Sequence, residues 1–149
     1  MRCWVCAVPL VVALAVAVYG QQGPANVLKI RPEANPIVRG KPSVVTLAFE
    51  IKPGFKIAKR PSPKLQLTAP EGMEVRGSLG LDEGGHPKDP EYFGAIKPLS
   101  LQVSAGTEVS PGQQKLSGKF VYFYCSEAEK YCSRSVEEVV VPLEVRASR

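Results

Sequence analysis

Two cysteines near the C-terminal end, Cys125 and Cys132, are the residues of this sequence best suited to chemistry. One alternating apolar run, residues 120–124, leads into the first cysteine, and a second, residues 136–145, follows the other. Two antiparallel strands joined by a short polar loop would bring the two residues within the Cα separation of a disulfide. The pattern therefore predicts a bridge at the end of a β-hairpin. Such a disulfide is either structural, or redox-active and therefore formed and broken as part of the protein's function.

The surrounding residues offer few other kinds of chemistry. Six residues separate the cysteines, a spacing that matches neither a thioredoxin-type C-x-x-C site nor a zinc knuckle. His86 is the only histidine, so neither a structural zinc site nor, without a serine motif, a hydrolase triad is expected. We expect no metal and no cofactor, because the acidic residues near His86 fit no regular calcium loop: Asp82, Glu83, Asp89 and Glu91.

The cysteine pattern alone slightly favours a structural bridge, because most disulfides of exported domains only hold the fold. Closing the short loop would contribute about 2.5 kcal/mol, which is small beside the core of a whole domain. The charges between and after the cysteines act in opposite directions on a thiol. Glu127 and Glu129 would raise its pKa, whereas Lys130 and Arg134 would lower it. The sequence does not decide the net effect.

Residues 1–20 have the layout of a secretory signal peptide. Arg2 supplies a positive start, an apolar stretch follows, and a small residue, Gly20, precedes polar glutamines. The apolar stretch is shorter than the roughly 20 residues that span a bilayer, so an uncleaved membrane anchor is the less favoured alternative. Cleavage would remove Cys3 and Cys6 and leave residues 21–149 as one exported domain with two cysteines. We expect the bacterial periplasm and no stable membrane insertion after cleavage.

The whole chain has 149 residues and a formal net charge of +5. Basic residues gather in one stretch with no acid between them, but only Phe55 supplies an aromatic ring there, so nucleic-acid binding is not expected. A solvated face is the favoured interpretation of these residues: Lys52, Lys56, Lys59, Arg60 and Lys64.

Alternating hydrophobic positions predict strands along most of the chain, in residues 27–31, 44–51, 65–67, 73–75, 99–103, 116–125 and 136–145. No window has a sustained helical period, and 14 prolines and 13 glycines disfavour long helices. The sequence therefore predicts an all-β fold, an immunoglobulin-like sandwich of six to eight antiparallel strands. The segment 77–98 has no such pattern and is long for a passive connection. If the protein exchanges electrons, this segment is the candidate for a mobile cover of the bridge. The alternative is a passive connection whose aromatic residues, Tyr92 and Phe93, pack into the core.

Several motifs resemble the N-terminal, immunoglobulin-like domain of the thiol:disulfide interchange protein DsbD family. The strand 118–125 with its terminal cysteine, the polar loop to Cys132 and the closing strand 139–143 carry the resemblance. Residues 53–55, 65–67 and 70–72 add weaker support, so that it covers roughly residues 27–145. Most of these patterns are shared by many sandwich families, and the cysteine hairpin is the most specific.

The resemblance implies a redox function for the bridge. In that family the two cysteines, here Cys125 and Cys132, are reduced by a thioredoxin-like partner and pass electrons to other periplasmic redox proteins. Tyr122 matches a supporting tyrosine, and Tyr92 or Phe93 matches the aromatic shield of a cap loop. The chain would then be a thiol:disulfide oxidoreductase component with no cofactor of its own.

The sequence also departs from that family. The family usually has one residue fewer between its cysteines, and the tyrosines expected after residue 54 are replaced by Lys56 and Ala58. Because the sequence ends at Arg149, the membrane and thioredoxin-like domains of the family are missing from it. Two functions from different classes remain: electron exchange with separate proteins, or a non-catalytic binding module whose bridge only stiffens the hairpin.

Overall fold

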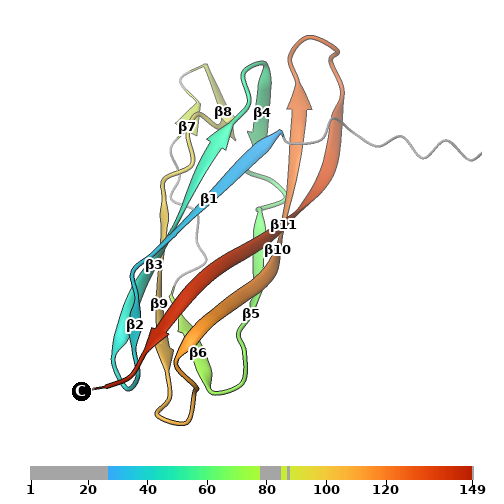
Figure 1. Cartoon of the computed structure of the whole chain (residues 1–149). Coiled ribbons are helices and arrows are strands. Elements are labelled where there is room, and N and C mark those ends of the chain that lie inside the picture. Colours follow the sequence, from blue (N-terminus) through green and yellow to red (C-terminus); the bar gives the residue numbers. More distant parts are fainter. Residues whose placement is uncertain (1–26, 78–84, 87, 149) are drawn as a thin grey trace, which may run out of the picture.

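The computed structural model describes residues 27–77, 85–86 and 88–148, and these residues form two curled sheets without a helix (Figure 1). The all-β, sandwich-like fold predicted from the sequence is confirmed. No helix in the described ranges is long and apolar enough to cross a bilayer. The predicted signal peptide, residues 1–20, lies outside the described residues.

One sheet has four strands in the order β1-β3-β9-β6. Each neighbouring pair is antiparallel. Its strands are β1 (Leu28–Ala34), β3 (Pro42–Ile51), β9 (Leu99–Ala105) and β6 (Met73–Arg76).

The other sheet has seven strands. Six follow the order β2-β11-β10-β4-β8-β7, and the seventh, β5, pairs with β10 beside β4. These strands are β2 (Ile37–Val38), β4 (Phe55–Ala58), β5 (Lys64–Thr68), β7 (Gly85–His86), β8 (Asp89–Phe93), β10 (Gly112–Ser126) and β11 (Cys132–Arg146). All pairs are antiparallel except the short parallel contact of β2 with β11.

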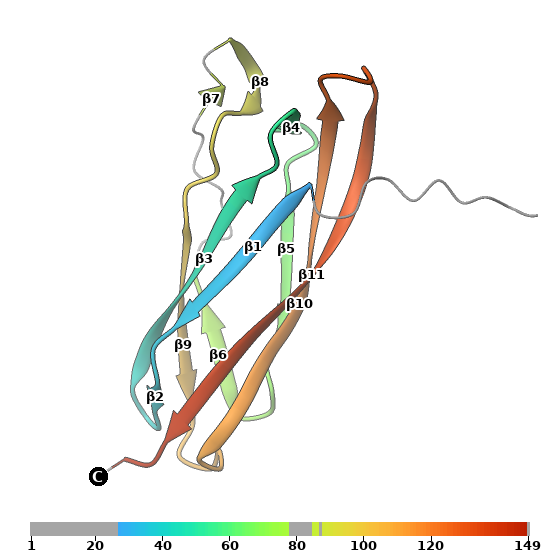
Figure 2. The same ribbon diagram turned by 45° about the horizontal axis from the view of Figure 1, so that its top comes forward.

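The hairpin of β10 and β11 is the longest element, with fourteen register pairs from Gly112–Val145 to Cys125–Cys132. Its turn lies at the same end of the molecule as β4, β7 and β8, as both views show (Figures 1 and 2). Period-two alternation turns one face of each strand inward, so that Phe120, Tyr122 and Tyr124 are buried. The strands predicted at residues 116–125 and 136–145 are confirmed and lie within β10 and β11.

The core lies between the two sheets. Phe49 of β3 contacts Phe120 of β10 across the interface, with ring centroids 5.3 Å apart. Leucine, isoleucine and valine side chains from both sheets are fully buried around this pair, among them Leu47, Leu101 and Val141. This shared core fixes the hairpin against the rest of the molecule and leaves its end free to carry the cysteines.

The described residues form eleven strands, more than the six to eight predicted, because short pairings such as β2 and β4 are too brief to give a periodic signal. The segment 77–98 is also not a plain loop, since its described part contains β7 and β8. Asp89 to Phe93 extend because Ile57 and Ala58 of β4 offer a free edge, where Ala58 pairs with Tyr92 and Ile57 with Phe93. A tertiary partner, not local alternation, makes this strand.

Candidate disulfide exchange site

Cys125 and Cys132 are direct register partners and form a disulfide, with Cα atoms 4.0 Å apart. The backbone hydrogen bond of the next pair, from Ser126 N to Tyr131 O at 2.8 Å, makes the cysteine pair one of the closely spaced, non-hydrogen-bonded kind. The bridge predicted from the two flanking strands is therefore confirmed as a bond that joins the hairpin at its end.

Ser126 organises the turn that follows Cys125. It is the one buried polar residue in the described part of the chain. Its hydroxyl accepts a hydrogen bond from Glu129 N at 3.1 Å, and its carbonyl accepts one from Lys130 N at 3.2 Å. Lys130 takes a positive φ of 55° in this turn. Glu127 N also donates to Gly54 O at 2.9 Å, which ties the turn to the connection before β4.

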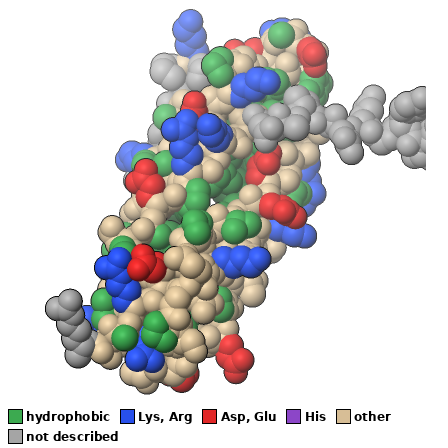
Figure 3. All heavy atoms as spheres, in the orientation of Figure 1, with side chains coloured by type: hydrophobic (Ala, Val, Ile, Leu, Met, Phe, Trp, Pro, Cys, Tyr) green, Lys and Arg blue, Asp and Glu red, His purple; other side chains and the backbone are tan. Residues whose placement is uncertain are grey.

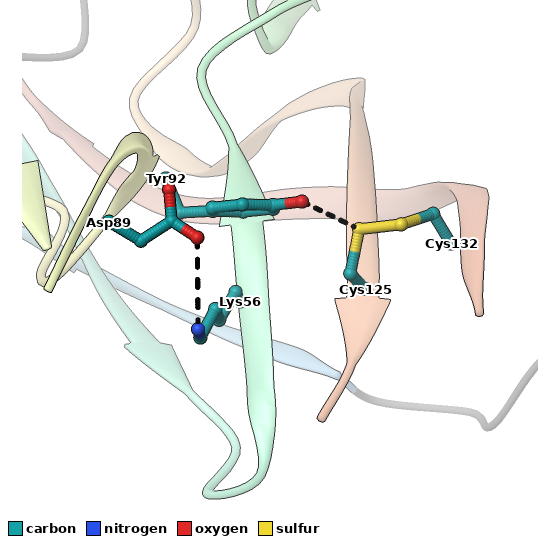
Figure 4. The surroundings of a disulfide bond; sticks show 5 residues. All are labelled: Lys56, Asp89, Tyr92, Cys125 and Cys132. Carbon is teal, nitrogen blue, oxygen red and sulfur yellow. Dashed lines mark hydrogen bonds and ion pairs between the residues drawn. A yellow bond between two sulfur atoms is a disulfide. The ribbon is translucent and has the colours of Figure 1, made fainter. Parts of the chain in front are cut away.

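Tyr92 reaches the bridge from β8, as Figure 4 shows. Its hydroxyl lies 3.4 Å from Cys125 Sγ. A disulfide sulfur has no proton, so the hydroxyl is the donor. Pairing with Ala58 and the bond from Lys59 N to Glu91 O at 2.9 Å hold β8 in place for this contact.

Phe93 points the other way. Its side chain is 5 % exposed and belongs to the hydrophobic core. Successive side chains of a strand alternate between faces, so only one of two neighbouring aromatic residues reaches the sulfurs. Of the two residues predicted as shields, the structure places Tyr92 at the bridge and Phe93 in the core.

Lys56 of β4 links the β10–β11 turn to β8 through two ion pairs. Its ammonium group lies 3.1 Å from Glu127, next to the cysteines, and 3.9 Å from Asp89 at the start of β8. It also lies 5.6 Å from the centroid of the Tyr92 ring (Figure 4). The sequence analysis treated Lys56 as one of a set of solvated cations, and no local signal pointed to this position.

Two other basic residues of that stretch lie over aromatic rings. Lys52 lies over the ring of Phe55 at 5.7 Å, and Lys59 lies over the ring of Phe93 at 5.8 Å. On the face shown in Figure 3, positive and negative side chains are interspersed.

The two sulfurs differ in accessibility. Cys132 is exposed, whereas Cys125 is partly buried beneath Tyr92. An open hollow of about 280 Å³ surrounds the bridge, and Lys56, Asp89, Tyr92 and Tyr131 contribute to its wall. Both cysteines line this hollow, and Cys132 is the more exposed of the two.

Tyr122, predicted as a supporting residue, lies inside the sandwich and not at the sulfurs. Its side chain is fully buried, and its hydroxyl donates to Glu137 Oε1 at 2.9 Å. Burial, with a smaller contribution from Glu137, raises the pKa of Tyr122 well above its ordinary value of 10.0. Tyr122 supports the hairpin that carries Cys125.

In the described part of the chain no group of three or more His, Cys, Asp or Glu side chains is placed to hold a metal ion. Asp82 and Glu83 lie outside the described residues. No protein-family model matches this sequence, and a comparison with curated proteins finds no match. A function is therefore inferred from the geometry around Cys125 and Cys132.

Proposed function

We propose that this chain is an exported thiol:disulfide exchange domain, related to the N-terminal domain of the DsbD family, that passes electrons through Cys125 and Cys132. The observation that carries the proposal is the asymmetry of the bridge. Cys132 is exposed at the end of a hairpin, and Cys125 is partly buried with the Tyr92 hydroxyl on its sulfur. The partners are thioredoxin-like or other periplasmic redox proteins.

The position of the bridge supports a functional role. Thirteen register pairs besides the cysteine pair already hold β10 against β11, and inward side chains such as Phe120 anchor both strands in the core. A bond at the far end of so long a hairpin constrains little of the remaining chain. Its location at the surface instead exposes one sulfur to a docking protein.

Exchange proceeds in two displacements. A partner thiolate attacks Cys132 Sγ, the sulfur–sulfur bond breaks, and its electron pair leaves on Cys125 Sγ as a thiolate. The second thiolate of the partner then attacks the partner's own sulfur and releases Cys132. The partner dithiol is oxidised to a disulfide, and the bridge takes up two electrons and, on protonation of both thiolates, two protons. Hydrogen bonding by Tyr92 favours departure of the Cys125 thiolate, because bonds to a charged acceptor are stronger.

Trapping experiments test this order of attack. The Cys125→Ala variant keeps the exposed thiol. When the thioredoxin-like protein has its own second cysteine replaced by serine, neither side can resolve the mixed disulfide, so covalent complexes should accumulate. The matched Cys132→Ala variant, whose remaining thiol is shielded, should accumulate far fewer. Equal trapping by both variants would contradict the order, and no trapping by either would contradict the function.

One observation favours the alternative, a non-catalytic binding module. Val136 and Val140 are 41 % and 50 % exposed on the outward face of β11, and apolar side chains exposed on one face are available to contact a partner. The reduction potential of the bridge separates the two functions. A value below roughly −300 mV marks a structural bond and would overturn the exchange function, whereas a more oxidising value supports it.

A further inference from the structure

Lys56 and Cys125 are directly opposed on neighbouring strands. Their Cα atoms are register partners in the pairing of β4 with β10, so their side chains leave the same face of the sheet. The Lys56 side chain is only 23 % exposed. Its ammonium group lies 5.6 Å from the centroid of the Tyr92 ring, and Lys56 contributes to the wall of the hollow around the bridge.

The charged groups that face this hollow come from three elements. Lys56 belongs to β4 and Asp89 to β8, while Glu127 and Lys130 belong to the turn between β10 and β11. Lys56 ion-pairs with both carboxylates, at 3.1 Å to Glu127 and 3.9 Å to Asp89. Of the two cations that face the hollow, Lys56 is the one ion-paired with both carboxylates, and it thereby offsets the negative charge beside Cys125.

Reduction of the disulfide changes the balance of charge around Cys125. When a thiolate attacks Cys132, a new negative charge forms on Cys125 Sγ, next to Asp89 and Glu127. Without a cation the two carboxylates would oppose that charge. The ammonium group of Lys56, already held between them, lies on the same face as the sulfur and needs only a side-chain adjustment to approach it.

We propose that Lys56 is a positioning residue that acts as the counter-ion of the departing Cys125 thiolate and thereby directs attack to Cys132. The inference rests on the proposed function for its biological use, but its chemistry is measurable on the protein alone. Lys56 acts together with Tyr92, which donates a hydrogen bond to the same sulfur. Charge and hydrogen bond both favour Cys125, not Cys132, as the leaving group.

The pKa of the Cys125 thiol is the first readout, measured from thiolate absorbance in a Cys132→Ser background. Lys56→Met keeps the length of the side chain, removes the charge and leaves two carboxylates facing the thiol. It should raise this pKa by about one unit, within the range that a neighbouring charge produces. Lys56→Arg should restore the value, and Glu127→Gln should lower it. Lys52→Met, at an exposed cation stacked on Phe55, is the control and should change nothing.

The site of attack is the second readout. The oxidised full chain is treated with glutathione, quenched with acid and mapped by mass spectrometry for the cysteine that carries glutathione. The wild-type protein should carry it on Cys132, and Lys56→Met should move a measurable share to Cys125. Circular dichroism of each variant checks that the fold is kept.

The outcomes separate this inference from the proposed function. An unchanged thiol pKa in Lys56→Met, or an equal shift in Lys52→Met, would overturn the role of Lys56 whatever the partners do. A raised pKa together with failure of both single-cysteine variants to trap any thioredoxin-like protein would support the role of Lys56 and reject the proposed function.

Discussion

Tyr122 and Tyr124 occupy neighbouring inward positions of β10, yet their hydroxyl groups have different surroundings. Both side chains are at most 1 % exposed. The Tyr122 hydroxyl donates to Glu137, whereas the Tyr124 hydroxyl is buried and meets no partner at hydrogen-bonding geometry among the described residues. The hydrogen bond to Glu137 therefore compensates the desolvation of the Tyr122 hydroxyl, whereas the desolvation of the Tyr124 hydroxyl is not compensated.

Removing each hydroxyl should therefore have unequal effects. Tyr122→Phe should lower the free energy of unfolding by about 1–2 kcal/mol, because it breaks a bond to a carboxylate and leaves that acceptor with less compensation. Tyr124→Phe should leave it unchanged or raise it, because no bond is lost and an uncompensated buried hydroxyl is removed. Denaturant unfolding of the oxidised protein measures both. A larger loss for Tyr124→Phe would contradict the assigned hydrogen bonds.

The difference in the free energy of unfolding between the wild type and Tyr122→Phe should also depend on pH. The folded state raises the pKa of Tyr122 above 10.0, so its stabilising effect is fully present below pH 10 and is lost as pH rises toward the folded pKa. Above pH 10 the unfolded state releases this proton and the folded state retains it. The stability advantage of the wild type over Tyr122→Phe should then shrink by up to about 1.4 kcal/mol per pH unit. A constant difference from pH 8 to about pH 11 would contradict this.

At the scale of elements, β8 directs Tyr92 to the disulfide and Phe93 to the core. The shielding of Cys125 by Tyr92 can therefore be tested without unfolding the protein. Tyr92→Ala removes the ring and hydroxyl over Cys125, so direct attack of a small thiol on Cys125 Sγ should become several-fold faster, while stability changes little. Phe93→Ala instead leaves a cavity in the core and should lower the free energy of unfolding by about 3–5 kcal/mol. Stopped-flow reduction and thermal unfolding distinguish the two. No gain in rate for Tyr92→Ala would count against the cover.

The pairing of β5 with β10 depends on a close approach at Gly118. A Cβ atom there would meet the Gln66 carbonyl oxygen and the Leu67 side chain, both on the opposing strand. Gly118→Ala should therefore lower the free energy of unfolding by about 1–3 kcal/mol through overpacking. Ser117→Ala, one residue earlier and directed to the other face, is the matched control and should have little effect in the same denaturant titration.

At the scale of the whole molecule, the core between the sheets makes the bridge dispensable for folding. Replacing Cys125 and Cys132 together by serine should lower stability by no more than about 2.5 kcal/mol, the loop-closure contribution of so short a loop. The variant should keep its far-ultraviolet circular dichroism and cooperative unfolding. A protein that exchanges electrons must remain folded in both redox states, so collapse of this variant would indicate a structural bridge instead.

Local alternation determined much of the framework from the sequence alone. The inward faces of β10 and β11 and the pairing of Cys125 with Cys132 were predictable, because a strand's side chains alternate and a short loop restricts which residues oppose each other. The all-β class followed from the same period and from the distribution of proline and glycine.

Only the tertiary structure decided what surrounds the bridge. Strand β8 forms because β4 offers it an edge, and that pairing, distant in sequence, directs Tyr92 to Cys125 and Phe93 to the core. Lys56 reaches the same place through the pairing of β4 with β10. Non-local pairing of short strands leaves no periodic signal in the sequence, because its stabilisation comes from the partner strand and from packing. The sequence therefore determined where the bridge lies, and the tertiary structure decided which of its sulfurs is covered.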